Sequence, residues 1–320
     1  MGAPSTIRGA IPALTPSFSI ITTCKGRLEH LKRSLPTMVA QDAEVIVVDY
    51  SCPEGTADFV ERDYPQAKVV RVEGQKGFSN WNARNRGAAV ATGEMLLFCD
   101  ADTILAEGAV AKIAEVLPPK SYGFFTRVAT EKFNRSNSRL AKNQMRGFHV
   151  LPARAFRALG GYDDVPEGYA AGGDTDLEDR MNQQGLKGFQ LGEGIVEDVI
   201  EHPHESRFTH HSDPIVISYA AGLLYRRAKI ALMNQLRKPN LPLKTRQEIY
   251  KAARTAAADI AKGKNVATLS VAFERRTIGM PRQLGFEQGE HSSTIVVRIN
   301  MKGKLDRIPM TAVNIGRSGP

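Results

Sequence analysis

The stretch Met95-Leu-Leu-Phe-Cys-Asp-Ala-Asp102 joins a short apolar run to two aspartates. A bounded apolar run of this length predicts a buried β-strand. Two carboxylates at positions i and i+2 directly after a strand can share a hard divalent cation and its phosphate ligands. A turn with surface acids is the alternative, but the strand before the aspartates and Thr103-Ile-Leu105 after them favour metal binding by Asp100 and Asp102.

The sequence around this stretch alternates between strand and helix patterns. Apolar runs typical of strands cover residues 18–23, 44–49 and 68–72, and helical spacing covers 27–40, 56–62, 82–92 and 106–116. This alternation predicts an α/β fold with a parallel, doubly wound sheet. Ligands bind at the carboxyl ends of the strands in such sheets. We therefore expect a binding site formed by the polar clusters Thr22 to Arg27, Asp49 to Ser51 and Asp100 to Thr103.

The pattern beyond residue 120 is less regular. It predicts a strand at 148–151, a short helix at 153–159, a long helix at 215–237, and late strands at 265–272 and 294–299.

The segment Gly172-Gly-Asp-Thr-Asp-Leu-Glu-Asp-Arg180 predicts the start of a helix that ends near Gly185. Thr175 and Glu178 match a capping box, and Asp176 and Arg180 can pair across one helical turn. Asp174 then lies at or just before the helix N-terminus. There it can act as a general base facing a cleft, or serve only as an N-cap, and the spacing leaves both open.

Histidines gather in Glu201-His-Pro-His204 and His210-His211, which hold four of the chain's seven. Imidazole is a common ligand for a metal such as Mn²⁺, so the cluster predicts at least one metal ligand. An exposed polar loop is the alternative for any single histidine.

The loop Gly77-Phe-Ser-Asn-Trp-Asn-Ala-Arg-Asn-Arg-Gly87 opens a predicted helix. Its Arg and Asn side chains at a helix start suit a nucleotide pyrophosphate. It fits neither the dinucleotide-binding fingerprint nor a P-loop. The alternative is a tightly packed helix start with a solvent-facing Arg84.

Together these blocks resemble glycosyltransferase family 2, with the Rossmann-like GT-A fold of a mostly parallel sheet flanked by helices. Ser19-Ile-Ile-Thr-Thr-Cys-Lys-Gly-Arg27 resembles the first strand and its base-binding loop, and Val47-Val-Asp49 resembles the second strand, whose Asp contacts uracil in that family. The stretch from Ala83 to Asp102 resembles the third block. Gly160-Gly-Tyr-Asp163 with Gly173-Asp-Thr-Asp-Leu177 resembles the acceptor and base block, closest to the chondroitin polymerase and β-1,4-galactosyltransferase type.

The resemblance implies a role for each matched residue. Asp174 falls on the catalytic base, Asp102 on a metal ligand, and His202 and His204 near the metal histidine, of which His202 is favoured. Gly173 stands where the family has Glu, and Asn80 stands where galactosyltransferases carry Arg, which weakens a UDP-galactose assignment. The residues expected to bind the nucleotide sugar are Thr22, Thr23, Arg27, Asp49, Phe78, Arg84 and Asp100.

The function implied is a metal-dependent transfer, inverting by resemblance. A hexosyl or N-acetylhexosaminyl group would move from a nucleotide donor, expected to be UDP-linked, to a hydroxyl of a glycan or lipid-linked acceptor, with Mn²⁺ or Mg²⁺ as cofactor. The alternatives are a sugar nucleotidyltransferase and a non-catalytic nucleotide-sugar-binding protein. The expected organisation is a flexible lead-in at 1–16, a GT-A domain at 17–237 and a basic C-terminal extension of unknown role at 238–320.

Composition is ordinary for a soluble globular protein, with 42% hydrophobic and 24% charged residues. Residues 214–320 hold 19 Lys or Arg against 6 Asp or Glu, a net charge of +13. We expect no nucleic-acid partner. Tyr225 to Lys238 can form a basic amphipathic helix on an anionic membrane, or a helix packed on the catalytic domain. Three scattered cysteines, no signal peptide and no membrane-length apolar run predict a cytoplasmic protein, peripheral at most at the inner face of the membrane.

Overall fold

A seven-stranded sheet forms the centre of the computed structural model of this chain, in the order β3-β2-β1-β4-β7-β6-β8. The strands are β1 (Phe18–Cys24), β2 (Glu44–Asp49), β3 (Lys68–Arg71), β4 (Met95–Phe98), β6 (Ser121–Phe124), β7 (His149–Pro152) and β8 (Lys187–Gln190). The structure describes residues 16–125, 145–166, 173–203, 206, 209–211, 214–236, 238, 240–262, 268–275, 291–299 and 310–317.

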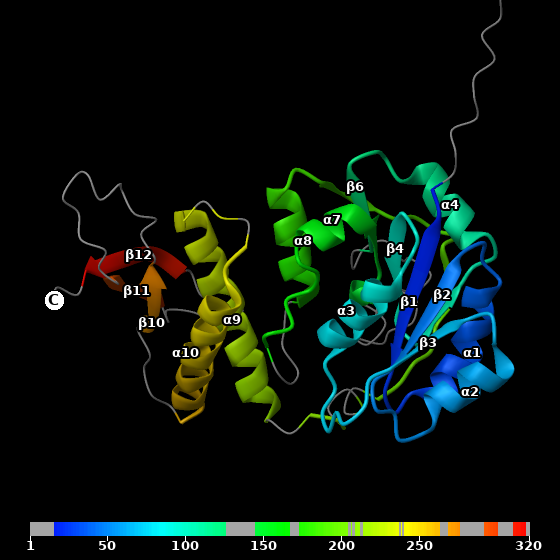
Figure 1. Ribbon diagram of the computed structural model, residues 1–320, viewed down its shortest axis with the longest axis horizontal. Coiled ribbons are helices and arrows are strands. Elements are labelled where there is room, and N and C mark those ends of the chain that lie inside the picture. The colour runs from blue at the N-terminus through cyan, green and yellow to red at the C-terminus, as the bar shows by residue number, and fades with distance from the viewer. Residues whose placement is uncertain are drawn as a thin grey trace, which may run out of the picture.

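The first four strands of the sheet are parallel, as the alternating pattern predicts. Ile20 of β1 lies between Val45 of β2 and Leu97 of β4 in the register. β7 then runs antiparallel to both β4 and β6, whereas β8 is parallel to β6. The sheet is therefore mostly parallel, and the expected α/β class is confirmed. The carboxyl ends of β1 to β4 point toward the lower edge of the sheet in Figure 1.

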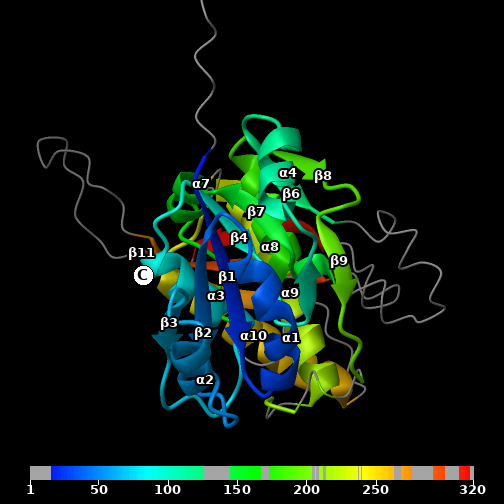
Figure 2. The same cartoon turned by 90° about the vertical axis from the view of Figure 1, so that its right-hand side faces the viewer.

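Helices cover both faces of the sheet, because successive strand residues point to opposite sides. Ile20 packs in a core with one set of helices and Ile21 in a core with the other. Figure 2 shows α1 and α2 in front of the sheet. The first set is α1 (Leu28–Val39), α2 (Thr56–Asp63) and α4 (Ala109–Val116), and the second is α3 (Asn80–Val90), α7 (Ala153–Ala158) and α8 (Gly173–Gln183).

Two long helices, α9 (Ile215–Leu236) and α10 (Leu243–Ala261), form a third layer beyond α8 (Figure 1). They share an apolar core, and α9 also contacts the domain through charge. Lys229 of α9 is fully buried, forms an ion pair with Asp163 and lies 2.5 Å from Asp176 Oδ1. Arg246 of α10 forms a second ion pair with Asp163, at 2.7 Å.

The segment from Tyr225 to Lys238 is the one for which the sequence allowed two alternatives, a basic amphipathic helix on a membrane or a helix packed on the catalytic domain. Tyr225, Leu232 and Met233 are buried within the α9–α10 core, and the basic Arg226 pairs with Asp179 at 2.6 Å. The part of the chain that the structure describes contains no helix long and apolar enough to cross a membrane. The boundary at 237/238 stays a prediction, but α10 beyond it packs on α9.

The remaining elements are short or lie near the C-terminus. β5 (Thr103–Leu105) pairs antiparallel with β9 (Val196–Val199), and η1 (Met145–Gly147) is a single 3₁₀ turn. The late strands form an antiparallel sheet of β10 (Thr268–Arg275), β11 (His291–Ile299) and β12 (Met310–Arg317). The expected strands at 265–272 and 294–299 correspond to β10 and β11 with shifted bounds. The strands β5, β6, β8, β9 and β12 and the helix α10 were not predicted.

Candidate functional site

The pairing of β5 with β9 brings His202 to Asp102. β5 begins directly after Asp102, and the Ile200 N–H donates to the Asp102 carbonyl oxygen at 2.7 Å. Two residues further along, the His202 Nε2 lies 3.2 Å from the Asp102 Oδ2. The two side chains are both largely buried. Two residues singled out separately in the sequence therefore form one pair at the carboxyl edge of β4.

The surroundings of this pair fit a divalent cation. The buried Oδ1 of Asp102 has no hydrogen-bond partner among the described residues. On the other side of the imidazole, His202 Nδ1 lies 3.1 Å from the Pro203 carbonyl oxygen and 3.4 Å from an Arg27 Nη. An Nδ1–H donated to that carbonyl would leave the Nε2 lone pair free to ligate, which is the usual support of a metal-binding histidine.

The described residues supply this pair and no larger set. No group of three or more His, Cys, Asp or Glu side chains that could hold a metal occurs among them. His204, the other predicted ligand, lies outside the described residues. A complete coordination shell would need further ligands, such as diphosphate oxygens and water.

Arg84 forms the charged centre of a second cluster beside this pair. Its guanidinium donates to Asp100 Oδ1 at 2.6 Å, to the Tyr162 hydroxyl at 3.0 Å and to Asp174 Oδ1 at 3.4 Å. The side chain is 1% exposed, so the alternative of a solvent-facing Arg84 does not hold. Burial would lower the Arg84 pKa, but Tyr162 and the two carboxylates outweigh it and raise the pKa above its ordinary value.

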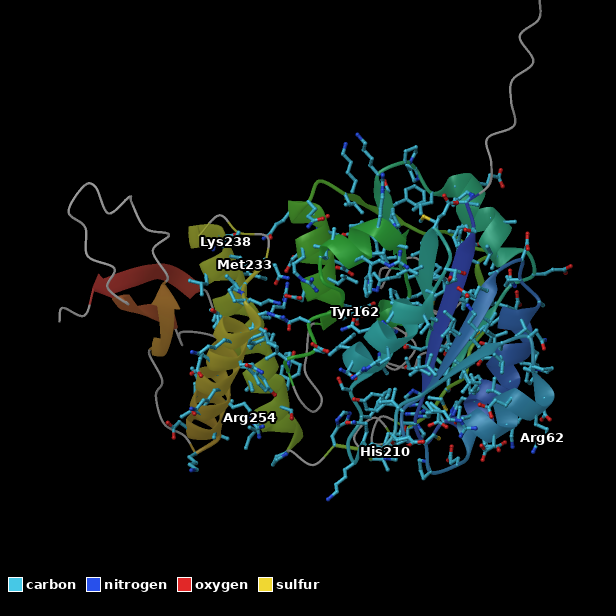
Figure 3. The ribbon with its side chains drawn as sticks, viewed as in Figure 1. Arg62, Tyr162, His210, Met233, Lys238 and Arg254 are labelled. Carbon is cyan, nitrogen blue, oxygen red and sulfur yellow. The ribbon has the colours of Figure 1, made fainter. Side chains whose placement is uncertain are left out.

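Asp100 is thus directed at Arg84, whereas Asp102 is directed at His202. The backbone of Gly147 makes this possible, because a Cβ there would lie 2.5 Å from Asp100 Oδ2 and 2.7 Å from an Arg84 Nη. Tyr162, which sequence reasoning did not single out, stacks on Trp81 at 5.3 Å between ring centroids. Figure 3 labels it in the loop between α7 and α8.

Asp174 lies in the first turn of α8, with its carboxylate directed at Arg84 and at His149. Burial raises the pKa of Asp174, while the positive charge of Arg84 and the His149 imidazole oppose the rise. A carboxylate with a raised pKa in a largely enclosed position is suited to accept a proton. The predicted Asp176–Arg180 pair is confirmed on the same helix, at 2.9 Å.

His149 is a site residue that the sequence did not reveal. It is fully buried, with Nε2 3.1 Å from Glu178 Oε1 and Nδ1 3.8 Å from Asp174 Oδ1. Glu178 fits a capping box in the sequence, but here its carboxylate contacts the imidazole. The only signal was the position of His149 in the predicted strand at 148–151.

Residues expected to bind the nucleotide occupy the ends of β1 and β2 and the start of α3. Thr23 Oγ1 donates to Asn80 Oδ1 at 2.8 Å, whereas Thr22 is fully buried and its Oγ1 has no partner among the described residues. Asp49 accepts from the Cys52 N–H at 2.6 Å and the Ala57 N–H at 2.8 Å, so both of its oxygens already hold the loop before α2.

Aromatic and basic side chains border the same region. Phe78 contacts Tyr50 edge to face at 5.7 Å between ring centroids. The Lys25 Nζ donates to the carbonyl oxygens of Tyr50, Ser51 and Gln75 at 2.6–3.0 Å, which joins three loops. Desolvation lowers the pKa of Lys25.

The histidine cluster divides between these two regions. His202 lies at Asp102, whereas the His210 carbonyl oxygen accepts from the Phe78 N–H at 3.0 Å and its ring lies against Gly26. His210 lies at the carboxyl edge of the sheet in Figure 3. Arg27 reaches from the β1 loop to Ser206 Oγ at 2.7 Å, so it faces the His202 segment.

Comparisons with known proteins agree with this architecture. Residues 19–162 match the sequence model of Glycosyl transferase family 2. Over 120 residues the chain is 28% identical to the SPbeta prophage-derived glycosyltransferase SunS of Bacillus subtilis (strain 168) and to the glycosyltransferase SunS of Bacillus phage SPbeta. The aligned stretch covers 37% of this chain but only 28% of each relative.

Two solved structures share the fold. One is the mannosyltransferase PcManGT from Pyrobaculum calidifontis in complex with GDP-Man and Mn²⁺, with a TM-score of 0.51 and 16% identity over 80% of this chain and 77% of that one. The other is S. aureus TarS 1-349 in complex with UDP-GlcNAc, with a TM-score of 0.51 and 15% identity over 76% of this chain and 73% of that one.

Proposed function

We propose that this chain transfers a sugar from a nucleotide-sugar donor to a hydroxyl group of an acceptor, because residues 19–162 match the model of Glycosyl transferase family 2. One observation carries the proposal. The Asp102–His202 pair and the Arg84 cluster with Asp100 and Asp174 converge at the carboxyl edge of the sheet, where ligands bind in this class of fold.

Asp174 is the proposed general base. As the acceptor hydroxyl attacks the anomeric carbon, the Asp174 carboxylate takes its proton, and the sugar–phosphate bond breaks. Attack from the face opposite the leaving diphosphate inverts the anomeric carbon. Arg84 supports this step because its buried guanidinium fixes the Asp174 and Asp100 carboxylates.

Asp102 and His202 are the proposed protein ligands of Mn²⁺ or Mg²⁺. The orphaned Asp102 oxygen beside an imidazole nitrogen is a mixed O and N donor pair, which suits Mn²⁺. When bound, the cation would neutralise negative charge on the leaving diphosphate. His204 stays a predicted third ligand.

The nucleotide base of the donor is proposed to bind among Thr23, Asp49 and Phe78. Lys25 would support this region, because it joins the loops at Tyr50, Ser51 and Gln75. UDP is our expected nucleotide. The two solved neighbours bind GDP-Man and UDP-GlcNAc in their complexes, so the donor screen below includes both bases.

The acceptor is proposed to be a glycan or lipid-linked hydroxyl, as in polysaccharide biosynthesis. Peripheral contact with an anionic membrane remains a prediction that rests on the net charge of +13 in residues 214–320. Co-sedimentation with liposomes of increasing phosphatidylglycerol content tests it, and binding that ignores the anionic lipid would remove it.

Calorimetry tests the function directly. Four proteins are compared: the wild type, Asp102→Asn, Asp174→Asn and the exposed control Asp42→Asn. Each is titrated with UDP, GDP, CDP and their sugars, first in the presence of Mn²⁺ and then in the presence of a chelator. We expect one nucleotide sugar to bind only with metal, and Asp102→Asn to weaken that binding by at least the roughly 10- to 100-fold typical of a disturbed metal site. Asp174→Asn and Asp42→Asn should bind the donor as the wild type does.

Turnover measurements distinguish Asp174→Asn from Asp42→Asn. Loss of a general base typically costs about 10²- to 10⁴-fold in rate, so Asp174→Asn should lose donor hydrolysis or transfer while Asp42→Asn keeps it. Absence of binding to every nucleotide sugar, with metal present, would contradict the proposal.

A further inference from the structure

A cavity of about 600 Å³ lies between α10 and the loop that follows Tyr162. Its volume is within the range of about 300–1,000 Å³ that small-molecule sites occupy. The loop contributes Asp164, and α10 contributes Leu243, Gln247, Tyr250, Lys251 and Arg254 from successive turns of one face. Figure 3 labels Arg254 on α10. The cavity lies outside the stretch that matches the family.

The cavity wall mixes apolar and hydrogen-bonding groups. Leu243 is 52% exposed, which is unusual for a large apolar side chain among the described residues. It borders the cavity together with Tyr250. The Gln247 amide can donate and accept, and the Asp164 carboxylate can accept. A ligand with an apolar ring face and several hydroxyl groups matches this combination.

The charged side chains of the lining restrict the class of ligand further. Lys251 and Arg254 lie one helical turn apart, so both cations are on the same side of α10. A guanidinium binds carboxylate or phosphate through two parallel hydrogen bonds, and an ammonium adds a point charge. Among the described residues of the lining the acidic group is Asp164, whose Oδ2 accepts from Asn82 Nδ2 at 3.0 Å. The described part of the lining therefore favours an anionic group at the α10 wall.

A hydrogen bond, a packing contact and ion pairs connect the cavity wall to the proposed catalytic centre. Asn82, which holds Asp164, lies one residue from Trp81, and the Trp81 ring packs against Gly173, the residue before Asp174. On the other side, Asp163 is held by Lys229, which also contacts Asp176 on α8. The cavity wall and the helix that carries Asp174 are thus fixed to the same ion-pair network.

We propose that this cavity binds the acceptor, and that the acceptor is a glycan carrying a carboxylate or a phosphate group. The acceptor role rests on the proposed transfer reaction, whereas anion-dependent glycan binding at the cavity does not. Residues of α10 would then select the acceptor, while residues 19–162 hold the donor.

The test is calorimetric binding of trigalacturonate, mannose 6-phosphate and neutral maltotriose to the full chain. At least one anionic probe should bind more tightly than maltotriose, and the better of the two tells carboxylate from phosphate recognition. Lys251→Gln with Arg254→Gln should weaken that binding about tenfold or more, because charge-assisted hydrogen bonds are lost. Lys262→Gln changes an exposed lysine directly after α10, outside the cavity lining, and this variant should bind as the wild type does.

A second variant tests the cavity rather than the charge. Gln247→Trp keeps both cations but fills space in the cavity, so it should weaken binding of the same probe. An unchanged thermal unfolding temperature would show that this variant still folds as the wild type does. Equal binding of maltotriose and the anionic probes, no binding of any probe, or wild-type affinity in the double variant would overturn the inference. Nucleotide-sugar binding is measured in a separate titration. Its absence in the wild type would count against the proposed function and not against glycan binding at the cavity.

Discussion

The imidazole of His149 lies against the Asp174 carboxylate, with 3.8 Å between Nδ1 and Oδ1. Glu178 holds the opposite ring nitrogen, so the imidazole is fixed between two carboxylates in a fully buried position. This arrangement resembles the way a third group orients an acid–base pair in many active sites. It makes His149 a positioning residue for the proposed base.

His149→Phe should change the pH dependence of turnover. His149 lowers the pKa of Asp174, and its removal lets burial raise that pKa further. The acid limb of the kcat profile should therefore move to higher pH, with the KM for the donor unchanged. His149→Gln, which keeps a polar group, should fall between this variant and the wild type. An acid limb that stays in place while kcat falls would assign His149 a purely structural role.

Asp174→Asn should be at least as stable as the wild type at neutral pH. The Asp174 pKa is raised in the folded state, so its contribution to stability is fully present below the unfolded pKa and is lost as pH rises through the folded pKa. Removing the ionised carboxylate at neutral pH therefore removes a cost. The advantage in Tm should shrink as pH falls toward 4, and scanning calorimetry between pH 4 and 7.5 measures it. An advantage that grows on acidification would contradict the sign.

Lys229→Met should destabilise the fold strongly. Asp163 and Asp176 would be left as buried carboxylates with one cation fewer, and breaking a buried pair from one side typically costs about 3–5 kcal/mol. Lys187→Met on an exposed strand position should stay within about 0.5 kcal/mol of the wild type. Urea unfolding gives both values. A small effect at Lys229 would mean that α9 does not depend on this network.

Cys52 should react first among the three cysteines. Its thiol is partly exposed and hydrogen-bonded by Cys24, which lowers the Cys52 pKa to about 5. Burial raises the pKa of Cys99, and the Cys52 contact together with burial raises that of Cys24. Because the thiolate is the nucleophile, iodoacetamide at pH 6.5 should label Cys52 well before the others, and mass spectrometry identifies the site. Equal labelling of Cys24 and Cys52 would contradict the low Cys52 pKa.

The local sequence pattern predicted several of the elements that bury apolar side chains at a regular period. The helix expected at 27–40 is α1, and the strand expected at 44–49 is β2 with the same bounds. Among the unpredicted strands, β5, β6, β8 and β9 have three or four residues each, too few to show a period. They form because neighbouring strands are already in place to pair with them.

The sequence by itself determined the α/β class, the parallel core of the sheet and the polar clusters at its carboxyl edge. Those features depend on residues near one another in the chain, where alternation and helical spacing act. Only the tertiary structure decided that Asp102 meets His202, that Arg84 is buried between Asp100 and Asp174, and that His149 lies behind the proposed base. Each contact joins distant parts of the chain, and only sheet pairing and helix packing bring those parts together.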